Sequence, residues 1–537
     1  MRPFTKSAVV GDNWPAAADL PSGEPVGLTM GWLDMPYLSN GVFSAGPVAL
    51  EVHQGDWHAA SAIYRKWFDQ HFNLRRSPDW LRQEMAWQSI IISNPEDVVV
   101  HRFSELPQLA ADAKKYGVTT FEILGWEMGG IDRGYPQYRP NPRLGTPEEF
   151  RGALKDIRAM GVHPLLFANT QAADTATPVY KSELSRYVVD ERWAPDLHLM
   201  GWGEGTISAR LGLARSNMAV VSPSHPEFRK FLMDQYMQMI RDGAEDFQLD
   251  KTNAVGMLDF NPALKVSPDK SLVNGVLDTF QELLKKGRAI NPDFSLASEI
   301  WIDRALPYVD VSYTRMGRID MTSTAMRFTF PEWKPTVFGE SPGDFNPMNN
   351  GMRYGMVWAL APRHCNDSLD DPLQQPLSRY VSELIRIRKQ YRDVLFDGRF
   401  RDTIGGSVSG GADVRYSVFE NNAATERALV VVNFGNQTEP AKVNLAGADG
   451  REVDISALFE ADRKGTLPLS LNIPANRCVI VVLRQRSRQM PSSAPCLPGS
   501  GGLMLGDIAF DELLKHGRHV DALGRGRGLE GVMKVDF

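Results

Sequence analysis

The stretch AEDFQLDKTNA, residues 244–254, contains an apolar run that ends in two adjacent charged residues. Phe247 and Leu249 indicate a strand, and Asp250 and Lys251 stand at its end, directly after a helix-like segment. Two charges at the end of a strand need water or each other. At the mouth of a barrel of parallel strands, the carboxylate can face a substrate while the ammonium keeps it ionised. The stretch therefore predicts a functional strand end; a solvated strand end without a function is the alternative.

Around this stretch, from about residue 84 to 392, segments that predict strands alternate with segments that predict helices. The strand segments are EMAWQSIII, VTTFEILGW, VHPLLFAN, EDFQLDK, DFSLASEIW and YVDVSYTR. In TPEEFRGALKDIRAMG, Thr146 is the expected N-cap, Pro147 lies in the first turn and Glu149 completes a capping box. Two helices are predicted at 348–360 and 376–391. Repeated βα units favour an α/β fold, a (β/α)8 TIM barrel, over a doubly wound sheet, because no Gly-rich phosphate turn follows an early strand.

Further segments flank this barrel. Residues 1–55 predict a β-rich N-terminal segment, too short for a sheet domain alone and similar to the remnant of a sandwich. A helix with Asp56 as N-cap begins the barrel region, 56–392. Short alternating strands over 393–485 predict a C-terminal antiparallel β-sandwich, and 486–537 form a linker and tail.

Composition restricts the partners. With 537 residues, 43% hydrophobic and a formal net charge of −6, the chain gives no reason to expect nucleic acid or a membrane surface as partner. Its three cysteines and scattered histidines lack metal-type spacing, so no metal or other cofactor is expected. No signal-peptide core is visible at the start, which predicts a cytoplasmic protein, or a secreted or periplasmic one if the true start lies upstream. The oligomeric state is not predicted.

Polar and aromatic residues gather where the predicted strands end, which is where barrel enzymes place their catalytic groups. They are Trp126, Asp132, Asn169, Asp250, Lys251, Glu299, Trp301, Asp303 and, less directly, Asp310 and Arg315. A site that cleaves glycosidic bonds needs one ionised carboxylate and one protonated carboxyl group. Asp250 beside Lys251 suits the first role. Glu299, among apolar neighbours, suits the second.

Several of these segments resemble a known superfamily. The run FEILGWEMGGIDRGYPQYRPNPRLGTPEEFRGALKDIRAMGVHPLLFAN is similar to the second and third strands of clan-D-like α-glycosidases and of the related endo-α-N-acetylgalactosaminidases. FQLDKTN resembles their fourth-strand nucleophile motif, and GDWHAASAIYRKWF resembles the helix that leads into their barrels. The likeness covers about residues 50–485.

The resemblance implies roles for single residues. Asp250 takes the nucleophile position, and Glu299 matches the acid/base glutamate of the mucin-acting branch. The α-galactosidase branch carries its acid/base Asp on the sixth strand, where this chain has Tyr313 and Arg315 instead. The remaining candidates are assigned to substrate binding: Trp126 as a sugar platform, Asp132 as a hydroxyl acceptor, and Asn169, Lys251, Trp301, Asp303 and Arg315, the last for an anionic substituent.

The leading hypothesis is therefore a retaining glycoside hydrolase that acts by double displacement on an α-linked sugar, of the α-galactoside or α-N-acetylgalactosaminide type. Asp303 and Asp310 are reserve candidates for the acid/base role. One alternative is a carbohydrate-binding barrel that has lost its catalytic groups. The other is an aldolase-like barrel in which Lys251 forms a Schiff base.

Overall fold

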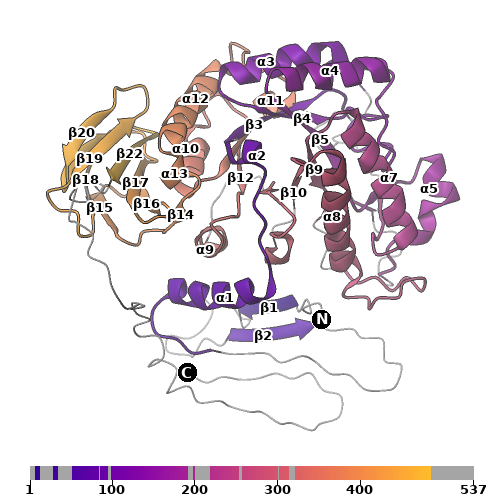
Figure 1. Ribbon diagram of the computed structural model, residues 1–537, viewed down its shortest axis with the longest axis horizontal. Helices are drawn as coiled ribbons and strands as arrows, with labels where there is room; N and C mark the ends of the chain where they lie inside the picture. Colours follow the sequence, from indigo (N-terminus) through magenta and orange to yellow (C-terminus); the bar gives the residue numbers. More distant parts are fainter. Residues whose placement is uncertain are drawn as a thin grey trace, which may run out of the picture. The chain divides into compact units, whose positions relative to one another are not determined.

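The computed structural model describes residues 7–12, 28–33, 51–83, 85–94, 98–191, 198–199, 218–252, 257–299, 302–313 and 321–484 (Figure 1). The chain divides into two units. One contains an antiparallel pair of strands, β1 (Ser7–Asp12) and β2 (Leu28–Leu33). The other contains every remaining described element.

The larger unit is built around an eight-stranded parallel sheet. Its order is β11 (Val311–Ser312), β10 (Ser295–Ser298), β9 (Asp246–Asp250), β5 (His163–Asn169), β4 (Thr120–Leu124), β3 (Ala86–Ile91), β13 (Val357–Leu360) and β12 (Thr336–Gly339). The outer strands meet where the Ser312 N–H donates to the Lys334 carbonyl at 2.9 Å and Ser312 pairs with Pro335. The sheet therefore closes on itself, and the predicted TIM barrel is confirmed.

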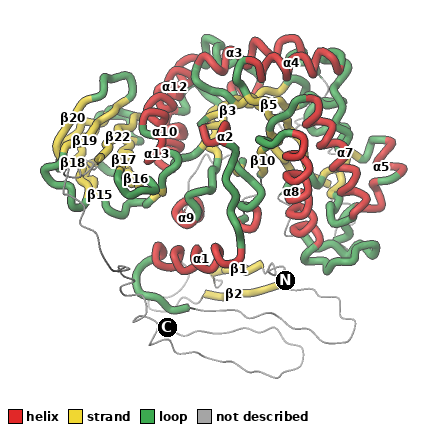
Figure 2. The backbone as a smooth tube through the Cα atoms, in the orientation of Figure 1, coloured by secondary structure: helices red, strands yellow, loops and turns green. Residues whose placement is uncertain are grey.

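Helices surround this barrel, as the ribbon and the tube in Figures 1 and 2 show. The longer ones are α3 (Leu106–Lys115), α4 (Pro147–Ala159), α7 (Pro226–Asp242), α8 (Ser271–Ile290), α9 (Met321–Thr329), α10 (Phe345–Tyr354) and α12 (Gln375–Gln390). Shorter ones are α2 (Asp79–Gln83), α11 (Pro362–Cys365), α13 (Arg392–Leu395), η2 (Phe103–Glu105) and η6 (Asp303–Ala305). Among the described residues, no helix is both long and apolar enough to cross a membrane.

The predicted helix starts are confirmed. In α1 (Trp57–His71), the Asp56 carboxylate accepts the His58 N–H at 3.0 Å. In α4, Thr146 and Glu149 form the expected capping box, with the Glu149 N–H donating to the Thr146 hydroxyl at 3.1 Å. Each cap satisfies backbone donors that have no partner inside the helix.

The predicted helix over 348–360 is wrong in its second half. Helix α10 ends at Tyr354, and Gly355 follows with a left-handed φ of +64°. A left-handed glycine is the usual helix stop. The next residues, 357–360, form β13, whose side chains are all buried. In a strand buried on both faces, polar and apolar residues do not alternate. Its hydrophobic pattern therefore cannot be distinguished from that of a buried helix.

A long connection with secondary structure of its own leads from β5 to α7. It contains β6 (Ala172–Asp174), α5 (Pro178–Ser182), η3 (Leu184–Tyr187), β7 (His198–Leu199) and β8 (Met218–Val220), with β8 paired to both β6 and β7.

The C-terminal region forms two antiparallel sheets, which confirms the predicted β-sandwich. The larger contains β14 (Arg399–Phe400), β16 (Val414–Glu420), β17 (Glu426–Asn433), β22 (Arg477–Arg484), β19 (Glu452–Ala457) and β20 (Arg463–Thr466); the smaller contains β15 (Gly406–Gly410), β18 (Glu439–Leu445) and β21 (Leu469–Ile473). Strand β17 is buried on both faces. Val430 and Val432 belong to the main core with the barrel, whereas Leu429 and Val431 belong to a second core inside the sandwich.

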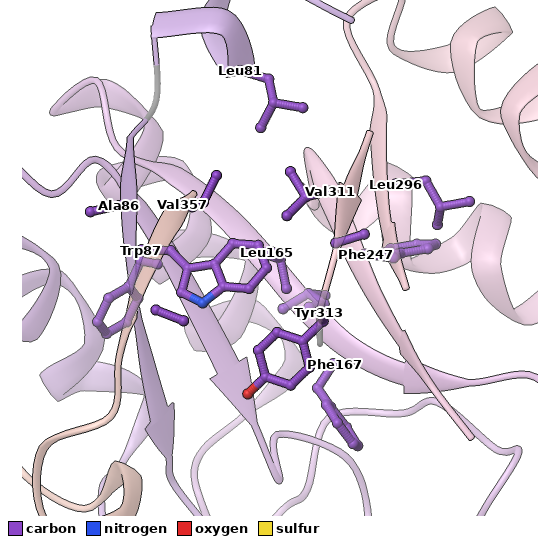
Figure 3. Packing of buried hydrophobic residues seen from close by; sticks show 14 of the residues in the cluster. Leu81, Ala86, Trp87, Leu165, Phe167, Phe247, Leu296, Val311, Tyr313 and Val357 are labelled. Carbon is purple, nitrogen blue, oxygen red and sulfur yellow. The ribbon is translucent and has the colours of Figure 1, made fainter. Parts of the chain in front are cut away.

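Large apolar side chains fill the interior of the barrel. Trp87 of β3 and Tyr313, just after β11, lie with their ring centroids 5.5 Å apart (Figure 3). Tyr313 also contacts Phe338 edge-on and is 3% exposed. Tyr313 is therefore part of the core.

Candidate active site

Three neighbouring barrel strands, β5, β9 and β10, bring polar residues together at their C-terminal ends. Asn169 ends β5 and is the register partner of Asp250, which ends β9. On the other side of β9, the Glu299 N–H, just after β10, donates to the Leu249 carbonyl at 3.2 Å. The carboxyl ends of parallel strands meet at one edge, so these residues lie at a common mouth.

Lys251 connects the carboxylates at this mouth. Its ammonium donates to Asp132 Oδ1 at 2.5 Å and to Asp250 Oδ2 at 2.7 Å. Its backbone N–H donates to Glu299 Oε2 at 3.0 Å. The two predicted catalytic carboxyl groups therefore contact the same residue, one through its side chain and one through its main chain.

The charges of this cluster depend on each other. Asp132, Asp250 and Lys251 are 4%, 6% and 8% exposed. Burial alone would lower the pKa of Lys251, but the two carboxylates outweigh burial and hold its pKa above the ordinary value. Lys251 is therefore an ammonium at neutral pH, and two carboxylates share its single charge.

The backbone is strained at both ends of the Lys251–Asp132 ion pair. Lys251 has a φ of +52° and Asp132 a φ of +61°. Residues with a Cβ seldom adopt this left-handed region, and such strain concentrates at functional sites. For Lys251, the end of β9 allows this turn, which brings its side chain back toward Asp250 beside it in sequence.

A glycine-rich loop after β4 positions Asp132. At Gly125 (φ +70°), an added Cβ would lie 2.0 Å from the Ser93 carbonyl oxygen. At Gly130 (φ +82°), an added Cβ would lie 2.2 Å from the Asn94 carbonyl oxygen. The glycines of GWEMGG therefore let the loop pack against the backbone that follows β3. Beyond them, the Asp132 N–H donates to the Tyr135 hydroxyl at 2.9 Å.

Glu127 is a buried acid of this loop that the sequence analysis missed. It is fully buried, and burial raises its pKa to about 8; the Asp132 carboxylate adds to this shift, whereas Tyr135 and Lys251 oppose it. Glu127 is therefore a neutral acid at neutral pH beside the charged cluster. Its position directly after Trp126, in the same segment as the other candidates, was the signal that could have identified it.

The pH dependence of stability tests the protonation of Glu127. In the folded chain Glu127 keeps its proton to about pH 8, whereas an ordinary Glu ionises near 4.5. The folded state thus binds one more proton across this window, and its contribution to stability falls as pH rises. When the pH rises from 5 to 7.5, the unfolding free energy of the wild type should therefore fall by about 3 kcal/mol relative to that of Glu127→Gln, which has no carboxyl group to titrate at this position.

Urea denaturation at the two pH values measures this difference. Glu148→Gln is the control, because Glu148 lies in the first turn of α4 with its side chain 75% exposed. The control should follow the wild type at both pH values. Parallel stability curves for the wild type and Glu127→Gln would show that Glu127 is ionised in the folded protein.

Trp126 and Asn169, both assigned to substrate binding, are buried and held by other parts of the protein. Trp126 is 1% exposed, donates its indole N–H to the Phe167 carbonyl at 3.0 Å and stacks on Phe150 at 5.2 Å. Its ring face is thus occupied by the protein. Asn169 is fully buried, and its Oδ1 accepts the Ala172 N–H at 3.0 Å. Both position the strand ends instead of presenting a surface to a ligand.

The remaining candidates lie elsewhere. Asp303 begins η6 and accepts a hydrogen bond from the Tyr64 hydroxyl of α1. Asp310 precedes β11 and forms an ion pair with Arg75, at the end where the strands begin. As a reserve for the acid/base role, Asp310 is therefore at the wrong end of the barrel. Trp301 and Arg315 lie outside the described residues.

Within the described ranges, no three His, Cys, Asp or Glu residues are grouped so that they could hold a metal ion. The cluster instead balances its carboxylates with the Lys251 ammonium.

Comparisons with known proteins add the family and the fold. A family model described as "Domain of unknown function (DUF6259)" matches residues 44–342. A search of the curated proteins finds no match. Among solved structures, an α-amylase from Geobacillus thermoleovorans is similar, with a TM-score of 0.53 and 12% identity over 77% of this chain and 100% of that one.

Two other structures are similar to the same degree. An α-amylase from Anoxybacillus has a TM-score of 0.54 and 12% identity over 77% of this chain and all of its own. A GH36 α-galactosidase from Geobacillus stearothermophilus has a TM-score of 0.54 and 10% identity over 80% of this chain but 59% of its own. At this identity, the likeness shows a shared barrel followed by a β-domain.

Proposed function

The chain belongs to the DUF6259 family, and we propose that its barrel is that of a retaining glycoside hydrolase acting on an α-linked sugar. The observation that supports the proposal most directly is the cluster at the C-terminal ends of β9 and β10, where Asp250 and Glu299 both contact Lys251. The similar solved structures, α-amylases and an α-galactosidase by their descriptions, support the same class of reaction.

The proposed reaction has two steps. The Asp250 carboxylate attacks the anomeric carbon while Glu299 protonates the departing glycosidic oxygen, which gives a glycosyl ester on Asp250 and a free alcohol. Water then attacks the same carbon, Glu299 takes the proton, and Asp250 is released as a carboxylate. The sugar leaves with its α configuration retained.

Lys251 has a role in both steps. In the resting site its ammonium contacts two carboxylates, those of Asp132 and Asp250. When Asp250 becomes a neutral ester, Lys251 and Asp132 form a balanced pair. The return of negative charge to Asp250 in the second step is then stabilised by the same ammonium.

The same geometry weakens the aldolase-like alternative. A Schiff base needs a neutral lysine amine. Because Asp132 and Asp250 hold the pKa of Lys251 above its ordinary value, its nitrogen stays protonated and is a poor nucleophile. The non-catalytic carbohydrate-binding barrel remains the competing function.

A substrate screen tests the proposal. The purified chain is incubated with 4-nitrophenyl α-galactoside, α-glucoside and α-N-acetylgalactosaminide, with the β-galactoside as the stereochemical control. We expect release from at least one α-glycoside, and NMR should detect the α-anomer of the sugar first. The β-anomer first would show inversion. Saturable sugar binding without release from any of them would favour the non-catalytic barrel.

A further inference from the structure

A cavity of about 450 Å³ lies at the other end of the barrel, where the strands begin. Its lining comes from residues 74–77, from α2, from the first residues of β11 and β13, and from residues 396–399. Figure 3 shows four apolar residues of this lining, Leu81, Trp87, Val311 and Val357. Because the candidate active site is at the C-terminal ends of the strands, this cavity is separate from it.

Cationic side chains outnumber acidic ones in the lining. The cations are Arg75, Arg76, Arg82, Lys334 and Arg399, and the acids are Asp310, Glu332 and Asp397. Glu332 is paired with Arg65, from outside the lining, at 2.8 Å, and Asp397 lies between Arg392, also from outside, at 3.0 Å and Arg82 at 3.4 Å. Arg76 is paired with Asp79 at 2.6 Å. Arg399 and Lys334 form no ion pair with a described acid.

Donor groups in the lining lack acceptors. Asp310 engages Arg75 through Nη2, and the buried Nε and Nη1 of Arg75 have no hydrogen-bond partner in the described structure. The Lys334 ammonium donates to the Phe396 carbonyl, and no described carboxylate forms an ion pair with it. Buried donors without acceptors are costly, so the cavity favours a ligand rich in acceptor oxygens.

The electrostatics at Lys334 are consistent with an anionic ligand. Burial, with Arg327 and Arg388 nearby, holds the pKa of Lys334 well below its ordinary value, although Asp397 opposes this. A bound anion would oppose this shift, because it favours the charged form of the side chain.

We propose that this cavity binds a small phosphorylated polyol, such as a sugar phosphate, with its phosphate among Arg75, Arg82, Lys334 and Arg399. Arginine forks pair with phosphate oxygens through parallel hydrogen bonds. The cavity volume falls within the range of small-molecule sites, roughly 300–1,000 Å³, so there is space for an organic group beside the phosphate. The apolar residues of the lining suit the carbon face of that group. The proposal does not depend on the glycosidase activity.

Calorimetric titration of the full chain with hexose 6-phosphate and with inorganic phosphate tests the proposal. We expect saturable binding of both, with the hexose phosphate tighter. Arg82→Gln combined with Arg399→Gln should weaken the binding of hexose 6-phosphate by about tenfold or more, because two charge-assisted contacts are lost.

Matched variants control for folding. Arg399 is exposed at the start of β14, so Arg399→Gln alone should fold normally and still weaken binding. Arg463→Gln, at an exposed position of β20, should leave binding unchanged. The proposal is overturned if neither ligand binds saturably at millimolar concentration, or if Arg399→Gln and the double variant bind as the wild type does. Inorganic phosphate binding as tightly as hexose 6-phosphate would overturn the assignment to a phosphorylated polyol.

Discussion

Replacing Asp250 by Asn is expected to lower kcat on an aryl α-glycoside by at least about a thousandfold, because an amide oxygen is a poor nucleophile. The change is nearly isosteric. The Lys251 ammonium, 2.7 Å from Asp250 Oδ2, can still donate to the amide oxygen, so the fold should be kept. Steady-state kinetics on the best substrate of the screen, together with thermal unfolding of the variant, separates lost chemistry from lost structure.

The same strand offers a matched control. Asp246 begins β9, four positions before Asp250, and is fully buried. Burial, with Asp310 nearby, raises the pKa of Asp246 well above its ordinary value, which favours the neutral form that Asn resembles. Asp246→Asn should therefore retain activity. If Asp250→Asn also retains wild-type turnover, Asp250 is not the nucleophile.

Replacing Glu299 by Gln is expected to give the second largest effect. Glu299 is half-buried just after β10, and its Oε2 accepts the Lys251 N–H at 3.0 Å, a bond that the amide oxygen of Gln can also accept. Loss of the acid should slow the hydrolysis of a poor leaving group by about 10²–10⁴-fold. A 2,4-dinitrophenyl glycoside needs little protonation, so formation of its glycosyl ester should be affected far less.

The leaving group thus serves as an internal control, and Glu340 offers a structural one. Glu340 follows β12 at the same end of the barrel, with its side chain 40% exposed. Glu340→Gln should leave the rates on both substrates nearly unchanged. An equal loss on good and poor leaving groups in Glu299→Gln would show that Glu299 is not the acid. A dependence on the leaving group in Glu340→Gln instead would transfer that role to Glu340.

The sequence predicted the elements whose signals are local. The capping box at Thr146 and Glu149, and the N-cap at Asp56, depend on residues within one helical turn. The charged end of β9 was visible because Asp250 and Lys251 interrupt an apolar run. Contacts within a few residues determine such features, so a single sequence is sufficient to predict them.

The sequence did not predict features that depend on distant contacts. The burial of Trp126 depends on Phe150 and on the Phe167 carbonyl, so the predicted sugar platform is a core residue in the structure. Asp310 was placed at the wrong end of the barrel because β11 has only two residues, too few to show where a strand starts. Strand β12, with four residues, was missed for a similar reason.

The burial of β17 on both faces limits which substitutions and domain exchanges this protein can accept in evolution. Val430 belongs to the core that the sandwich shares with the barrel. Its two sequence neighbours, Leu429 and Val431, belong to the core within the sandwich. Substitutions in this one strand can therefore disturb the packing of two cores, one on each face of the strand. Fusing the C-terminal sandwich to an unrelated barrel would leave one face of β17 without the residues that it packs against here.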